Sequence, residues 1–388
     1  MATAVRTVRA TLLGTVTVTA VAALTAATLT APAAAESRTR DHQPTQQAMD
    51  AAVADGVPGV AGQAVDQYGT WKGTSGVGNL RTGKQRSAHD RYRIASITKT
   101  FVATVLLQLQ GEGKLDLDDT VEKWLPGVVH GNGHDGSEIT VRQLLNHTSG
   151  IFDYTSDPAL ARKYLYKGFL KHRYDTLEPT DLVAVAMRHK PVFEPGDGWS
   201  YSNTNYTLAG MIIEKVTGRT YGTEIEQRVI KPLGLHATRV PGTEHWVGWP
   251  SSRAYSTLSD KPQGRTYDVT ELNPSMAGAA GEMISDSGDL NRFFGALLGG
   301  ELLPAKQLKE MKTTIPVEGE PNAGYGLGLI KEKLSCGKVV WGHSGGFHGS
   351  ISQALTTTKG DHSLAFNFNG DWSGDSRAVG EAEFCGTN

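Results

Sequence analysis

Two polar residues, Ser96 and Lys99, stand three positions apart near the start of the apolar segment 91–111. The apolar residues of this segment recur at helical spacing and Gly111 provides a stop signal, so the pattern predicts a core helix. Residues three apart share a helix face, and the Lys99 amine can therefore reach the Ser96 hydroxyl. A serine at a helix N-terminus also lies where free N–H groups favour a developing anion. The spacing thus predicts a nucleophile, a base and an anion site within one turn.

The Ser-x-x-Lys spacing is weak evidence by itself, because it arises by chance about once or twice in a chain of this length. It recurs at residues 335–338, next to a cysteine and without a helical pattern after it. For the first copy, the alternative is a helix-terminal serine beside a solvated lysine.

A second polar motif comprises Tyr201 and Asn203, which follow a Pro195-Gly196 turn. A phenol and an amide two residues apart can point into one cleft if the segment is an extended loop. The alternative is a loop tyrosine with a capping asparagine.

Residues 342–346 fit G-x-S-x-G, the nucleophile elbow of α/β-hydrolases, with Ser344 as the nucleophile. That elbow requires a helix next and then a separated Asp and His. A β-rich segment follows instead, and Asp361 and His362 are adjacent. We therefore interpret 342–346 as a strand edge beside Ser96, whose backbone can bind a substrate. A metal hydrolase is disfavoured, since H-E-x-x-H is absent and His130 and His134 stand in a glycine-rich loop.

The elements that must position these motifs follow a clear order along the chain. Short β-like runs over 59–78 predict a hairpin, and strands return after residue 321. Helices are predicted over 139–147 (with Thr140 as cap), 205–216, 285–298 (capped by Asp286 or Ser287) and 377–384. We expect an α+β fold, with an antiparallel sheet flanked by helices. Residues 36–95 and 280–388 would form its α/β domain and 96–279 a mostly helical domain, with the active site at their interface.

The first 35 residues have the features of a secretory signal. Arg6 and Arg9 precede an Ala/Thr/Val/Leu-rich run, and residues 33–35 offer an A-x-A cleavage site. Removing 1–35 takes away two positive charges and no negative ones, which changes the formal charge from −2 to −4. We expect a secreted, extracellular protein with no electrostatic basis for binding nucleic acid, and no second stretch long enough to span a membrane. Its two cysteines, Cys336 and Cys385, then form one disulfide by default; two free thiols are the alternative.

Ser96-Ile-Thr-Lys99, Tyr201-Ser-Asn203 and His343-Ser-Gly345, in this order, resemble the three motifs of the penicillin-recognising serine hydrolases. This family includes D-Ala-D-Ala carboxypeptidases, class C β-lactamases, D-aminopeptidases and related esterases. The chain is most similar to secreted D-Ala-D-Ala carboxypeptidases of actinobacterial type and to D-stereospecific amidohydrolases. The resemblance extends over 113–127, 139–154, 201–218, 324–329 and the cysteine pair, essentially the whole mature chain. It implies a β-lactamase/transpeptidase-like fold.

The resemblance also implies a role for each motif residue. Ser96 would be the acylated nucleophile, and Lys99 and Tyr201 would share the proton transfers as a coupled pair. Asn203 would hold Lys99 and a substrate amide. The N–H groups of Ser96 and Gly346 would form the oxyanion hole.

The strand motif differs from many relatives at two places. His343, beside Ser344 and Gly345, replaces a lysine and would add positive or switchable charge to the cleft. Ile330 stands where the similar carboxypeptidases carry an arginine for the substrate carboxylate, and Lys331 would point to the other face of the strand. This departure favours relatives that act on longer D-peptides or on D-amino-acid amides and esters.

We therefore expect a serine peptidase or amidohydrolase, D-Ala-D-Ala carboxypeptidase-like, that acts through an acyl-enzyme on Ser96 and passes the acyl group to water or an amine. Its substrates would be small D-peptides, D-amino-acid amides or esters, or peptidoglycan stem peptides. β-Lactams would be acylating ligands, no cofactor is implied, and a monomer is expected. The alternatives are a D-aminopeptidase, a β-lactamase or an esterase of the same family, and a non-hydrolytic penicillin-binding sensor, against which the intact motifs argue.

Overall fold

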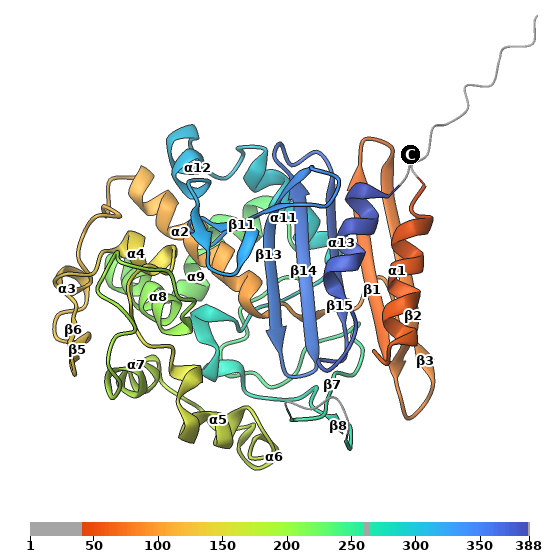
Figure 1. Ribbon diagram of the computed structural model, residues 1–388, viewed down its shortest axis with the longest axis horizontal. Coiled ribbons are helices and arrows are strands. Elements are labelled where there is room, and N and C mark those ends of the chain that lie inside the picture. Colours follow the sequence, from red (N-terminus) through yellow and green to blue (C-terminus); the bar gives the residue numbers. More distant parts are fainter. Residues whose placement is uncertain (1–40, 260–263, 387–388) are drawn as a thin grey trace, which may run out of the picture. The chain divides into compact units, whose positions relative to one another are not determined.

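A nine-stranded antiparallel sheet organises the chain in the computed structural model, which describes residues 41–259 and 264–386 (Figure 1). The predicted signal segment 1–35 lies outside the described residues. The strand order is β10-β11-β12-β13-β14-β15-β1-β2-β3. The strands are β1 (Gly59–Asp66), β2 (Gly69–Asn79), β3 (Lys84–Gln85), β10 (Ile315–Val317), β11 (Glu320–Tyr325), β12 (Ile330–Lys333), β13 (Val339–Phe347), β14 (Ser350–Thr357) and β15 (Ser363–Phe368).

Strands from both ends of the chain meet at the centre of the sheet. β1 pairs with β15, which places Val60 opposite Phe368, and β1 also forms the predicted hairpin with β2. Every residue of β15 is buried, because helices cover both of its faces. This arrangement confirms the predicted antiparallel sheet flanked by helices.

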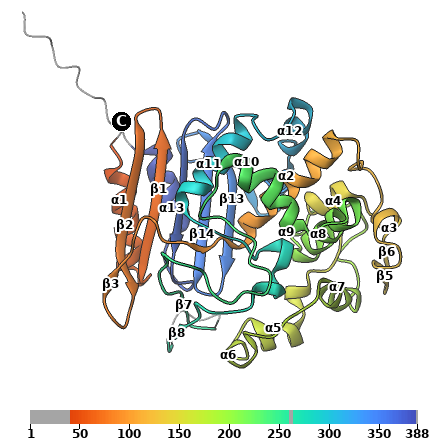
Figure 2. The same ribbon diagram turned by 180° about the vertical axis from the view of Figure 1, so that it is seen from behind.

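Two helical layers cover the central strands. α1 (Gln43–Ala54) and α13 (Ser376–Cys385) pack together on one face, where Phe366 and Phe368 join their apolar cluster. α11 (Ser287–Leu298) packs on β14, β15 and β1 from the other face, as Figure 2 shows from behind. The carboxylate of Asp286, one of the two predicted caps, accepts a hydrogen bond from the N–H of Asp289 at the start of α11.

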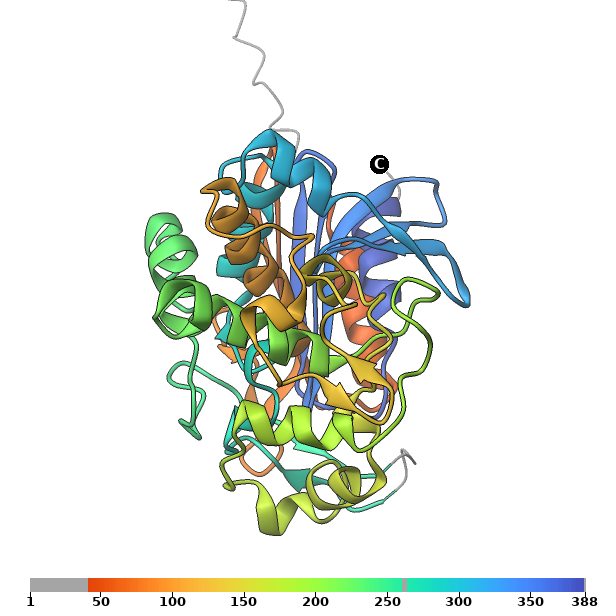
Figure 3. The ribbon, with the colours of Figure 1, turned by 90° about the vertical axis from the view of Figure 1, so that its left-hand side faces the viewer.

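A helical region lies beside the sheet in Figure 1, and Figure 3 shows it with this side facing the viewer. Its helices are α2 (Thr98–Gly111), α3 (Val121–Trp124), α4 (Val141–Leu145), α5 (Pro158–Tyr164), α6 (Phe169–His172), α7 (Pro179–Met187), α8 (Asn203–Thr217), α9 (Tyr221–Ile225), α10 (Lys231–Leu233) and α12 (Ala305–Met311). Short 3-10 turns η1 (Ala95–Ile97), η2 (Tyr154–Ser156), η4 (Pro274–Met276) and η5 (Gly278–Ala280) and a π-turn η3 (Glu226–Ile230) connect them. Three two-stranded ladders complete the described fold: β4 (Tyr92–Arg93) with β9 (Ile284–Ser285), β5 (His130–Gly131) with β6 (His134–Asp135), and β7 (Tyr255–Ser256) with β8 (Tyr267–Asp268).

α2 is the predicted core helix, but it begins later than the apolar pattern suggested. Tyr92 and Arg93 pair with Ser285 and Ile284 in the β4–β9 ladder, and Ala95 has a φ of 48°. A residue with positive φ interrupts a right-handed helix, so the segment turns sharply before α2 starts at Thr98. Ser96 therefore lies in the η1 turn immediately before the helix.

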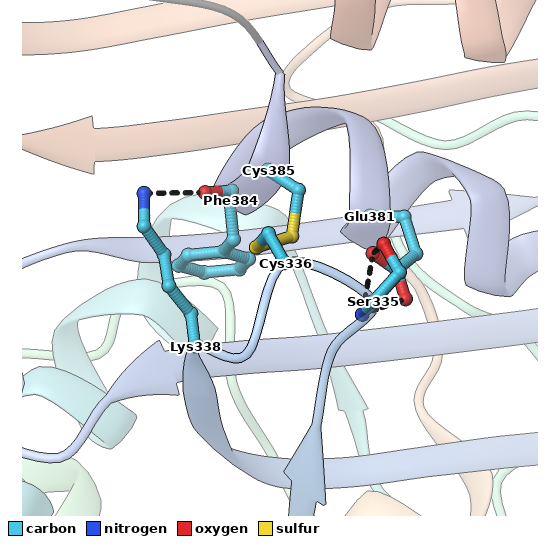
Figure 4. The surroundings of a disulfide bond; sticks show 6 residues. All are labelled: Ser335, Cys336, Lys338, Glu381, Phe384 and Cys385. Atoms are coloured by element: carbon cyan, nitrogen blue, oxygen red, sulfur yellow. Dashed lines mark hydrogen bonds between the residues drawn. A yellow bond between two sulfur atoms is a disulfide. The ribbon is translucent and has the colours of Figure 1, made fainter.

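The Cys336–Cys385 disulfide is present and ties the β12–β13 turn to α13 (Figure 4). The neighbouring Ser335 donates to the Glu381 carboxylate through its N–H and its hydroxyl, and Lys338 donates to the Phe384 carbonyl at 2.7 Å. The second Ser-x-x-Lys copy is thus structural, because its two polar groups fasten one turn to one helix instead of meeting each other. The disulfide also excludes the alternative of two free thiols.

The predicted division into 36–95 with 280–388, and 96–279, stays a proposal. Within 41–259 and 264–386, no helix combines the length and the apolar character needed to cross a bilayer.

Candidate active site

The side chain of Lys99 joins three segments of the chain at one point: its own, the segment of Tyr201 and Asn203, and the turn of Ala280. Its Nζ lies 3.0 Å from Ser96 Oγ, 2.8 Å from Asn203 Oδ1 and 2.7 Å from the carbonyl oxygen of Ala280. Tyr201 packs over the same amine, with its ring centroid 4.8 Å from Nζ. The structure therefore brings together the two motifs that sequence spacing placed 105 residues apart, and adds the carbonyl of η5 to them.

Burial shifts the acid–base properties of Lys99. The side chain is fully buried, and this desolvation lowers the pKa of its amine to about 7, against a smaller opposite effect from the Asp153 carboxylate. A substantial fraction of the amine is therefore neutral near pH 7, and a neutral amine can accept a proton.

Burial acts in the opposite direction on Tyr201. It raises the pKa of the phenol above its ordinary value, while a hydrogen bond with Ser96 works against this rise. Of the two proton carriers, Lys99 thus has the lowered pKa and Tyr201 the raised one. The phenol stays protonated at neutral pH and can donate but not abstract a proton there.

Asp153 is a site residue that sequence reasoning missed. Its carboxylate accepts hydrogen bonds from the backbone N–H of Asn203 at 3.2 Å and from Asn203 Nδ2 at 3.2 and 3.4 Å. The amide can then present only its oxygen to Lys99, which fixes its orientation. Asp153 lies within the segment 139–154 that resembles the family, but no short motif marked it.

His147 was also missed, although it too lies in 139–154. It is fully buried, has a φ of 63°, and its ring centroid is 4.3 Å from that of Tyr201. The N–H of Ser202 and the side-chain amide of Asn205 lie 3.3 and 3.1 Å from its Nδ1. Burial and the charge of Lys99 lower the pKa of His147 well below its usual value. A neutral imidazole therefore supports the back of the Tyr201 ring.

The segment 342–346 lies in the middle of β13, where it pairs with β14 over its whole length. The segment is thus a strand beside Ser96, as predicted, and the nucleophile elbow is wrong, because no strand-to-helix turn forms at Ser344. The binding of a substrate by its backbone stays a prediction. Gly345 is needed for the close approach of this strand to η1. A Cβ added there would lie 2.9 Å from the Ser96 nitrogen and closer still to the Ile94 carbonyl oxygen.

His343 does not carry the charge that was expected of it. The imidazole is 2% exposed, and its Nε2 lies 2.9 Å from the hydroxyl of Tyr325. Burial, with a further effect of Lys99, lowers its pKa to about 3. His343 is thus neutral at physiological pH, since its imidazole is buried against Tyr325.

Two cavities meet at Ser96 and Gly346. The first, the Asn203 cavity, has a volume of about 430 Å³ and is also lined by Tyr154, Met276 and Phe347. The second, the Tyr201 cavity, has a volume of about 530 Å³. Besides Ser96, residues from four other parts of the chain line the Tyr201 cavity, among them Trp199, Tyr201, Glu320, Ile330, Glu332, His343, Ser344 and Arg377.

Ile330 faces the Tyr201 cavity, while Lys331 is not among its lining residues and has its Nζ 5.9 Å from the ring of Trp341. This agrees with the predicted alternation of side chains along β12. A third cavity, of about 660 Å³, lies along α8 and α9 and contains none of the predicted site residues.

The comparisons with known proteins agree with this geometry. Residues 45–381 match the model of the Beta-lactamase family. A D-stereospecific amidohydrolase from Streptomyces sp. is 63% identical, with a TM-score of 0.86 over 90% of this chain and 100% of that one. The D-amino acid amidase of Ochrobactrum anthropi SV3, complexed with L-phenylalanine amide, is 31% identical, with a TM-score of 0.72 over 85% and 91% of the two chains.

A sequence relative, penicillin-binding protein 4* of Bacillus subtilis, is 29% identical over 269 residues, which are 66% of this chain and 56% of that protein. The chain thus spans about half the length of the curated relatives it matches. The family model covers most of the chain, and both solved structures share its fold. The protein is a serine hydrolase of the Beta-lactamase family, with the β-lactamase/transpeptidase-like fold that its sequence predicts.

Proposed function

We propose that this protein is a D-stereospecific amidohydrolase that acylates Ser96 with a D-amino-acid amide, peptide or ester. One observation carries the proposal: an amine with a pKa of about 7 lies 3.0 Å from a serine hydroxyl where two cavities meet. The Streptomyces amidohydrolase and the Ochrobactrum amidase support the substrate class.

Lys99 acts as the base that activates Ser96. A neutral amine has two N–H groups and one lone pair. The Asn203 Oδ1 and the Ala280 carbonyl can only accept hydrogen bonds, so they take both N–H groups. The lone pair is then left for the hydroxyl of Ser96, which can pass its proton to Nζ.

Acylation proceeds through a tetrahedral intermediate. As Lys99 takes the proton, Ser96 Oγ bonds to the substrate carbonyl carbon, and the backbone N–H groups of Ser96 and Gly346 stabilise the resulting oxyanion. The bond to the leaving nitrogen then breaks, and that nitrogen receives a proton through Lys99 and Tyr201. Water, activated by the same amine, attacks the ester and releases the D-amino acid and free Ser96. An amine in the place of water gives aminolysis.

The two cavities divide the substrate between them. The leaving group needs a proton, and Tyr201, a proton carrier, lines only the cavity named after it. The leaving group therefore occupies the Tyr201 cavity. The acyl group, which stays on Ser96, occupies the Asn203 cavity.

A substrate panel tests the proposal. The purified protein should hydrolyse D-phenylalanine amide, leave L-phenylalanine amide nearly untouched, and turn over a penicillin slowly or not at all. Ser96→Ala, as the matched control, should be inactive on the whole panel. Faster turnover of the penicillin than of any D-amide would support the β-lactamase alternative and overturn the proposal.

We also propose that the protein is exported, on the basis of Arg6, Arg9 and the A-x-A site at 33–35. N-terminal sequencing of protein recovered from culture medium should find a start near residue 36. Protein that stays inside the cells with an intact residue 1–35 segment would contradict export.

A further inference from the structure

Three charged side chains line the Tyr201 cavity: Glu320 from β11, Glu332 from β12 and Arg377 from α13. Arg377 Nη2 lies 2.9 Å from Glu332 Oε1, and its Nη1 lies 3.9 Å from Glu320 Oε2. Glu332 is the inner partner, with a side chain 15% exposed against 49% for Arg377. It lies two positions after Ile330 on β12, so both side chains face the same cavity.

Arg377 is the one lysine or arginine among the described residues lining this cavity, and its guanidinium is already bound to a carboxylate. The start of α13 provides no free anion site either, because Asp375 Oδ1 accepts hydrogen bonds from the N–H groups of Arg377 and Ala378 at 2.9 and 3.1 Å. Two carboxylates therefore face one guanidinium at the place where the leaving group departs. An incoming carboxylate would have to displace Glu332 from Arg377 and remain beside both glutamates.

We propose that Glu332 is a specificity-determining residue that occupies Arg377 and, together with Glu320, makes the leaving-group cavity refuse a free carboxylate and favour amides, esters and leaving groups with a positive charge. This inference rests on the proposed function and on the leaving group lying in the Tyr201 cavity. The replacement of the family arginine by Ile330 only removes a ligand for the substrate carboxylate. Glu332 and Glu320 add an effect of a different kind, because their negative charges repel that carboxylate.

The first test compares D-Ala-D-Ala with its C-terminal amide. The wild-type kcat/KM should favour the amide by about tenfold or more, and the preference should weaken as salt is raised, because the charges are partly exposed. Glu332→Gln frees Arg377 and should narrow the preference by about fivefold or more, mainly by lowering KM for the free acid. Arg377→Gln should increase the preference for the amide, because no guanidinium then balances the negative charges of Glu320 and Glu332. Glu138→Gln, an exposed glutamate that does not line the cavity, is the matched control and should leave it unchanged.

The second test uses two leaving groups of similar size. The wild-type enzyme should hydrolyse D-Phe-lysinamide several-fold better than D-Phe-norleucinamide, and the double variant Glu320→Gln/Glu332→Gln should treat the two alike. This pair of substrates also tests the inference on the wild type alone, should a variant fail to fold.

A wild-type kcat/KM that is higher for the free acid than for the amide overturns the inference. So does a ratio of these two kcat/KM values in Glu332→Gln that stays within twofold of the wild-type ratio. Failure of the wild-type protein to hydrolyse any D-amide overturns the proposed function instead. If the variants hydrolyse D-amides with the wild-type ratio of amide to acid kcat/KM, the proposed function stands and only the role of Glu332 is contradicted.

Discussion

Lys99 Nζ lies 2.7 Å from the carbonyl oxygen of Ala280, a residue 181 positions later in the chain. This hydrogen bond and the one to Asn203 Oδ1 occupy the two N–H groups of the neutral amine. In the proposed mechanism, the amine of Lys99 accepts a proton from Ser96, and the protonated phenol of Tyr201 donates one.

The identity of the nucleophile can be tested by covalent labelling. Ser96→Ala should abolish the adduct formed with a β-lactam, because the activated hydroxyl is gone. Ser344→Ala should still be labelled, since Ser344 lies on β13 and the serine hydroxyl that is hydrogen-bonded to Lys99 Nζ is that of Ser96. Intact mass spectrometry of both variants measures this, and an adduct surviving on Ser96→Ala would contradict the assignment.

The coupling of the two proton carriers has a kinetic signature. Lys99→Ala and Tyr201→Phe should each slow acylation by at least ~100-fold, the usual effect of removing a positioned proton carrier. The double variant should lose much less than the product of the two single effects, because both residues serve one proton path. Burst kinetics with a chromogenic D-amino-acid anilide provide the measurement. Fully multiplicative losses would mean two separate paths.

The pH dependence of kcat/KM should report Lys99. Its amine has a pKa of about 7 and is active when neutral, so kcat/KM should rise with pH through about 7 and fall away at acid pH as the amine is protonated. The nearby Asp153 carboxylate raises this pKa by stabilising the ammonium form. Asp153→Asn removes that charge and should move the rising limb to lower pH. Asp181→Asn, an exposed residue of α7, is the control and should leave the profile in place. A shift of the Asp153→Asn profile to higher pH would show that Lys99 is not the titrating group.

The disulfide should contribute to stability rather than to catalysis. It closes a loop of 49 residues, and removing it as Cys336→Ser/Cys385→Ser should cost about 4 kcal/mol of unfolding free energy. Denaturant titration measures the loss, and Ellman titration of the denatured, unreduced wild type should find no free thiol. Equal unfolding midpoints for wild type and variant would show that the bridge between the β12–β13 turn and α13 adds nothing.

Much of the local structure follows from the amino-acid sequence, because it depends on neighbouring residues. The periodicity after Lys99 predicts α2, and the capping box of Thr140 with Gln143 begins α4 as expected. The β-like runs at the two ends of the chain predict the strands that meet in the sheet. Ser96 and Lys99 could be paired from sequence alone, since three residues of helical backbone suffice to bring them together.

The remaining parts of the site depend on contacts that no local spacing encodes. Asp153 orients Asn203 across 50 residues, and the Ala280 carbonyl reaches Lys99 across 181. Burial, which comes only from packing, lowers the pKa of Lys99 and leaves His343 neutral where the residue type alone suggested a charge. Sequence could show that Ile330 replaces an arginine, but only the tertiary structure places Arg377 and Glu332 in the same cavity, because α13 and β12 meet through the folding of the C-terminal strands and the disulfide.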